Sequence, residues 1–167
     1  GLTAEPARVA LCAALIQRWK EDDPAGAANI VMNLATGQIQ VDLLGDVLPH
    51  WGQAGFKNAL EWVRRLPPSR GQLAGLIHLS YKWVKTAPEE AAAFARELPP
   101  GNDQFIGTVA SQWARQDPEA AAGWALQLPA GPTKDRALSS LTAAWAQLDP
   151  RASAEFALRL PPGPVQQ

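Results

Sequence analysis

Few side chains in this chain have the types and spacing that catalysis or metal binding requires. The two histidines, His50 and His78, stand alone, with no second histidine four residues away. A zinc site of the HExxH kind needs that spacing, because both imidazoles must reach one ion from the same helix face. The single cysteine, Cys12, cannot form an internal disulfide. We therefore predict that the protein is not an enzyme and that it has no metal site and no cofactor.

The acidic pairs do not indicate a catalytic site, and the charge balance does not favour a nucleic-acid partner. Asp22-Asp23 and Glu89-Glu90 precede or begin predicted helices, where a carboxylate is favourable to the helix dipole. Lys and Arg number 15 against 16 Asp and Glu, for a net charge of −1. A nucleic-acid strand would need a continuous basic stripe, so we expect no nucleic-acid partner. The sequence also contains no apolar run long enough to span a membrane, and we expect no membrane partner.

Seven tryptophans are the remaining candidates for binding chemistry, since indole rings stack on sugars, peptides and bases. Five of them recur with spacings of 32, 32, 30 and 32 residues, and these are Trp19, Trp51, Trp83, Trp113 and Trp145. A constant spacing of this size is typical of a repeat protein. Because the five share a predicted helix face with leucine and valine, we interpret them as core residues.

A second set of anchors follows the same period, eleven residues after each tryptophan of the first set. The second anchors are Ile30, Trp62, Phe94, Trp124 and Phe156. Four residues before each tryptophan of the first set stand Leu15, Val47, Leu79, Val109 and Leu141. Offsets of three, four and seven residues define one face of an α-helix. Each repeat is therefore predicted to be two amphipathic helices.

Helix boundaries are marked by proline and glycine. Asp23-Pro24, Asp117-Pro118 and Asp149-Pro150 place an N-cap carboxylate before proline in the first turn. The predicted helices span 4–20, 24–35, 38–52, 55–66, 69–86, 88–98, 102–116, 118–128, 133–148 and 150–160. No strand pattern competes with them, so the predicted fold is an all-α, right-handed α-solenoid of about five helix-turn-helix repeats of ~32 residues.

We expect residues 1–167 to form a single repeat domain. Its predicted parts are a half-repeat 1–22, repeats 23–54, 55–86, 87–116 and 117–148, and a half-repeat 149–167. Residues 160–167 match 128–135, where a further helix begins, and the first helix matches the second half of a repeat. Since solenoid ends normally carry a polar cap, we expect this sequence to be a segment of a longer array.

The stretch from Leu141 through Trp145, Asp149 and Ala154 to Leu160-Pro161 resembles the tetratricopeptide family. The resemblance covers nearly the whole chain, although the usual Gly-x-x-Tyr pattern is absent and the unit has 32 residues. The chain is similar to a divergent member of that family or to another helical-hairpin solenoid. The resemblance implies a protein-interaction scaffold that binds a peptide or a partner subunit on its concave surface.

Opposite the core stripe of the tryptophan-bearing helices, equivalent positions vary from repeat to repeat. Variation within a column is what recognition of a partner needs, whereas an ordinary solvated helix face is the alternative interpretation. The predicted partner-binding groove consists of Asp42, Asp46, His78, Tyr81, Gln104, Thr108 and Arg136. Small residues six positions before tryptophan, Gly107 among them, predict close helix approach, so a Gly107→Leu variant is expected to be destabilised.

Two functional classes are consistent with these patterns. The first is a non-catalytic scaffold that binds a protein or peptide on the inner face of stacked helical hairpins. The second is a structural spacer or self-assembly module that stacks through uncapped solenoid ends. The variable polar columns favour the first, and the apolar ends favour the second.

Overall fold

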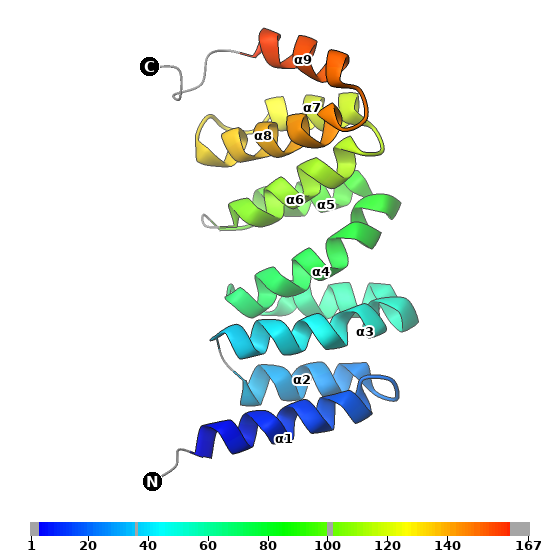
Figure 1. Cartoon of the computed structure of the whole chain (residues 1–167), viewed down its shortest axis with the longest axis vertical. Helices are drawn as coiled ribbons and strands as arrows, with labels where there is room; N and C mark the ends of the chain where they lie inside the picture. The colour runs from blue at the N-terminus through cyan, green and yellow to red at the C-terminus, as the bar shows by residue number, and fades with distance from the viewer. Residues whose placement is uncertain (1–3, 36, 100–101, 161–167) are drawn as a thin grey trace. The chain divides into compact units, whose positions relative to one another are not determined.

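The computed structural model describes residues 4–35, 37–99 and 102–160 (Figure 1). Every regular element in these ranges is a helix, which confirms the all-α prediction. The helices are α1 Ala4–Trp19, α2 Pro24–Leu34, α3 Gly37–Arg65, α4 Arg70–Thr86, α5 Pro88–Glu97, α6 Asp103–Ala114, α7 Pro118–Leu126, α8 Pro132–Ala146 and α9 Pro150–Arg159. None of these described helices is both long enough and apolar enough to cross a membrane.

The two helices expected at 38–52 and 55–66 are present as the two parts of α3, which a kink at Gly55 separates. Only Gly55 has non-helical backbone angles, φ −158° and ψ 66°, and it marks a kink within the helix. This junction lacks the Asp-Pro pair found before α2, α7 and α9. Without an N-cap carboxylate and a proline, the chain departs from the helix for a single residue.

The chain divides into two compact units, residues 1–79 and 80–167, and the boundary falls within α4. In the first unit α1 packs against α2, α2 against α3, and α1 also against α3. In the second unit each helix from α5 to α9 packs against the next, and α6 packs against α8. Within each unit, contacts therefore join helices that are one or two positions apart along the chain. The repeat boundaries and the single repeat domain stay predictions.

The tryptophan-bearing columns form much of the core. Trp51, Trp83, Trp113 and Trp145 are buried, as predicted. Each lies against its second anchor, in the pairs Trp51–Trp62 (5.4 Å between ring centroids), Trp83–Phe94 (5.4 Å), Trp113–Trp124 (6.0 Å) and Trp145–Phe156 (5.3 Å). Trp83, Trp113 and Trp145 thus each connect two successive helices, whereas Trp51 and Trp62 lie on either side of the kink in α3.

Trp19 is the exception, because it is 43% exposed and its assignment to the core is wrong. Its second anchor is Ile30, which offers no ring to lie against the indole. Trp62 is half-buried, and its Nε1 donates a hydrogen bond to Asn29 Oδ1 at 3.0 Å. The second-anchor column is therefore less deeply buried at Trp62 than at Trp124.

The predicted Asp-Pro caps are present. Asp23, Asp117 and Asp149 each accept a hydrogen bond from the backbone N–H three residues later, at 2.9 Å. Such a bond satisfies one of the four N–H groups that a helix start leaves without an intrahelical partner. Helix α5 begins differently, since its N-cap residue is Ala87 and makes no side-chain cap bond.

An Ala87→Asn variant is expected to raise the free energy of unfolding by about 1 kcal/mol. Ala87 has φ −152° and ψ 71°, close to φ −147° and ψ 89° at the capping residue Asp117. An asparagine oxygen at position 87 can therefore make the same bond without adding charge beside Glu89 and Glu90. Urea unfolding would measure the gain. Asp117→Ala is the reciprocal control, with an expected loss of similar size, and a neutral result for both variants would contradict this account of the caps.

Candidate partner-binding groove

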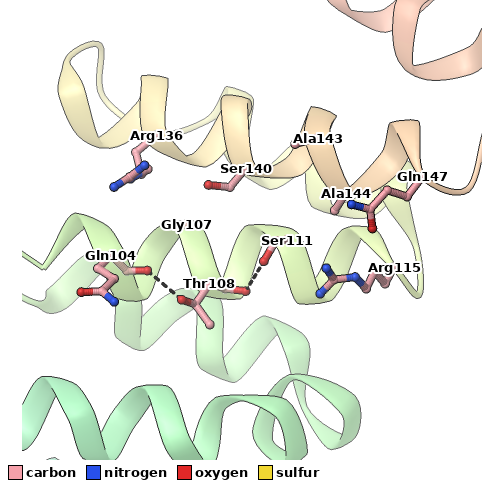
Figure 2. A pocket seen from close by; sticks show the side chains of 10 residues that line it. All are labelled: Gln104, Gly107, Thr108, Ser111, Arg115, Arg136, Ser140, Ala143, Ala144 and Gln147. Carbon is pink, nitrogen blue, oxygen red and sulfur yellow. Dashed lines mark hydrogen bonds between the residues drawn. The ribbon is translucent and has the colours of Figure 1, made fainter. Parts of the chain in front are cut away.

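Helices α6 and α8 approach closely where α6 has no side chain. Gly107 is buried, and a Cβ atom there would lie 2.8 Å from Ser140 Oγ and 3.2 Å from Arg136 Cγ. Gln104 lies beside Arg136 and Arg115 beside Gln147 (Figure 2), and each pair occupies equivalent repeat positions, so the two helices are aligned turn by turn. The small-residue column thus predicted a real close approach. It brings the polar faces of two equivalent helices together.

A groove with a volume of about 320 Å³ runs along this α6–α8 contact (Figure 2). It is lined by Gln104, Gly107, Thr108, Ser111, Arg115, Arg136, Ser140, Ala143, Ala144 and Gln147. On the α6 side, Gln104, Thr108, Ser111 and the C-cap residue Arg115 follow one another at intervals of four, three and four residues, which places them on one face. We call this feature the α6–α8 groove.

Three residues predicted from the sequence lie in the α6–α8 groove, namely Gln104, Thr108 and Arg136. The sequence interpretation missed Arg115 and Gln147, which occupy the second position after Trp113 and Trp145. It considered only positions before each tryptophan. Continuing the same helix face by one more turn would have identified both.

The other predicted groove residues lie elsewhere. Asp42 accepts a hydrogen bond from Gln38 Nε2 at 2.8 Å, and Asp46 accepts one from Gln17 Nε2 at 3.3 Å. Both belong to the first compact unit, and Tyr81, 67% exposed, belongs to the second. None of them lines the α6–α8 groove, and their part in a binding surface stays a prediction.

His78, the remaining predicted residue, also belongs to the first unit and lies beside Gly45. A Cβ atom at Gly45 would be 3.1 Å from His78 Nε2. Burial of part of the imidazole lowers the pKa of His78, because desolvation penalises its charged form. The His78 imidazole thus lies over the position on α3 where Gly45 has no side chain.

The side chains of the α6–α8 groove are donors and acceptors without a reactive pair. Thr108 Oγ1 donates to Gln104 O at 2.8 Å, and Ser111 Oγ donates to Thr108 O at 3.0 Å. The hydroxyl protons are thus used within α6, and the oxygens remain acceptors for a ligand. Within the described part of the chain, no three His, Cys, Asp or Glu side chains gather where they could hold a metal. The arrangement suits hydrogen bonding to a ligand.

A second hollow lies between α7 and α9 and has a volume of about 450 Å³. Its lining consists of Glu119, Ala122, Gly123, Leu126, Trp145, Ala152, Glu155, Phe156 and Arg159. Glu155 accepts a hydrogen bond from Arg151 Nε at 3.2 Å, so one of the carboxylates that line this hollow already has a charged partner. No residue predicted for the partner-binding groove lies in this hollow. It provides a reference surface for experiments on the α6–α8 groove.

Comparison with known proteins does not place this chain in a family. No family model matches it, and no curated protein and no solved structure is significantly similar. The argument for function therefore depends on the residues of the groove.

Proposed function

We propose that the chain is a non-catalytic scaffold that binds a protein or peptide segment in the α6–α8 groove. In this proposal the helices form a right-handed α-solenoid of about five repeats of the tetratricopeptide-like kind, and the groove lies on its inner face. The all-helical fold and the packing of helices one and two positions apart support this arrangement.

The observation that carries the proposal is that Gln104, Thr108 and Arg136 line one groove. The variation of their columns between repeats, on the face opposite the core, independently predicts these residues as binding residues. Gly107 removes the side chain that would hold α6 and α8 apart. A row of polar side chains along a shallow groove matches recognition of an extended segment, in which backbone groups and alternate side chains are both bound.

The second candidate function, a spacer or self-assembly module, is favoured by the apolar surface of α9. Ala154 and Ala157 are exposed, whereas their repeat counterparts Ala122 and Ala125 on α7 are buried. A second copy that stacked on α9 would cover them. Sedimentation of wild type and an Ala154→Glu/Ala157→Glu variant distinguishes this function, because stacking predicts concentration-dependent association that the variant loses.

Selection from a displayed library of random peptides tests the binding function directly. Peptides selected on the wild type are expected to bind a Gln104→Ala/Thr108→Ala/Arg136→Ala variant at least about tenfold more weakly, since several hydrogen bonds are lost. Calorimetric titration with the purified peptides measures the difference.

The matched control is Glu119→Ala/Glu155→Ala/Arg159→Ala, which alters the α7–α9 hollow in the same compact unit. This variant is expected to retain wild-type affinity. Circular dichroism must show equal helicity for all three proteins. Peptides that bind the groove variant as well as the wild type, or a selection that yields no binder, would contradict the proposed function.

A further inference from the structure

The α6–α8 groove has an unbalanced charge. Its two charged side chains are Arg115 and Arg136, and no carboxylate lines it. Among the described residues, neither guanidinium makes an ion pair or a side-chain hydrogen bond. The chain as a whole carries a net charge of −1, so this local positive charge does not follow from overall composition. A ligand with negative charge would complement it.

The two arginines lie at opposite ends of the groove (Figure 2). Arg136 is the α8 counterpart of Gln104 at one end, and Arg115 on α6 is the counterpart of Gln147 at the other. Arg115 follows Gln104 by eleven positions in the sequence. At 1.5 Å of rise per residue, the ends of the groove are about 16 Å apart along the helix axis.

The distance between the two ends of the groove favours an extended ligand with two negative charges about that far apart. An extended chain advances by about 3.3–3.6 Å per residue, so four residues cover roughly 14 Å. Side chains four residues apart also point to the same side of an extended chain. Two carboxylates with this spacing can therefore each reach one guanidinium, which binds a carboxylate with paired N–H donors.

The centre of the groove suits a peptide backbone. Ala143 is exposed and carries only a methyl group, which lets a ligand backbone approach α8. The amides of Gln104 and Gln147 supply donors and acceptors, and the Ser111 oxygen supplies an acceptor. Two cations are too few for the continuous basic stripe that a nucleic-acid strand requires.

Given the proposed binding function, we propose that the ligand of the α6–α8 groove is an extended acidic peptide segment. Two of its side-chain carboxylates, four residues apart, contact Arg136 and Arg115. The segment between them lies over Ser140 and Ala143.

Three nine-residue peptides with acetylated and amidated ends test this assignment by fluorescence anisotropy. All are built on threonine and valine, which favour extended structure. One has glutamate at positions 3 and 7, one has glutamate at positions 3 and 4, and one has glutamine at positions 3 and 7. The first is expected to bind at least about tenfold more tightly than either of the others, and added salt is expected to weaken it.

Arg115→Gln/Arg136→Gln is expected to remove this preference. The control Arg96→Gln/Arg159→Gln loses the same charge from exposed positions outside the α6–α8 groove and is expected to keep the preference. The reversed variant Arg115→Glu/Arg136→Glu is expected to prefer a peptide with lysine at positions 3 and 7. Binding of the lysine peptide by the reversed variant would show that substitutions at positions 115 and 136 leave the protein folded.

The outcomes separate this inference from the function on which it depends. If library-selected peptides bind the groove but glutamine replaces glutamate without loss, the acidic-ligand inference is overturned and the binding function stands. If neither designed nor selected peptides bind, both are overturned. Equal binding of the two diglutamate peptides overturns the four-residue spacing. Tighter, arginine-dependent binding of a nine-nucleotide oligothymidylate overturns the assignment to a peptide.

Discussion

Replacing Trp83 with alanine is expected to lower the free energy of unfolding by about 3–5 kcal/mol. Trp83 is 1% exposed and its ring centroid lies 5.4 Å from that of Phe94 and 6.2 Å from that of Phe105. One indole on α4 thereby contacts aromatic rings on α5 and α6. Alanine would leave a cavity bordered by both rings, and rigid helices can fill such a cavity only in part.

Urea unfolding followed by circular dichroism measures this loss. Tyr81→Ala is the matched control, because Tyr81 lies on the same helix and is 67% exposed. The control is expected to change stability by no more than about 0.5 kcal/mol. Similar losses at the two positions would contradict the assignment of the periodic tryptophans to the core.

The variant Gly107→Leu is expected to be less stable than the wild type by about 1–3 kcal/mol. Its Cβ atom alone would lie 2.8 Å from Ser140 Oγ and 3.2 Å from Arg136 Cγ, so a leucine must displace these side chains of α8. The helix propensity of leucine is better than that of glycine by close to 1 kcal/mol, which offsets only part of this cost. Thermal unfolding and peptide affinity should both decrease, since the same contact forms the α6–α8 groove.

Gly123→Leu provides the opposite case within the same unit. Gly123 lies inside α7, and a Cβ atom there would meet nothing within 4 Å. The substitution is expected to raise stability by up to about 1 kcal/mol through helix propensity alone. If both leucine variants were stabilised, position 107 would have to face solvent and the close approach of α6 and α8 would be wrong.

Much of the helical structure could be predicted because it is specified locally. The helices predicted to start at residues 24, 88, 118 and 150 begin at Pro24, Pro88, Pro118 and Pro150, where proline fixes the first turn. The kink at Gly55 was predicted as a break between two helices. The sequence around Gly55 lacks the Asp-Pro pair that caps other helices, and this absence does not determine how sharply the two parts of α3 are separated.

The groove was only partly predictable. Column variation identified Gln104, Thr108 and Arg136, because repeat positions on one helix face stay on one face when helices stack in alignment. Arg115 was missed because it lies beyond the tryptophan, at the end of α6. The charge balance of the groove depends on which side chains surround it in space, and single columns do not contain that information.

Mapping of backbone amide shifts by nuclear magnetic resonance tests the central claim most directly. The ¹⁵N-labelled full chain would be titrated with the tightest library-selected peptide, and shift changes would be assigned to residues. The account predicts changes concentrated in residues 104–115 and 136–147, the two ranges that contain the lining of the α6–α8 groove. Changes concentrated in α7 and α9 around the second hollow, with α6 unaffected, would contradict it.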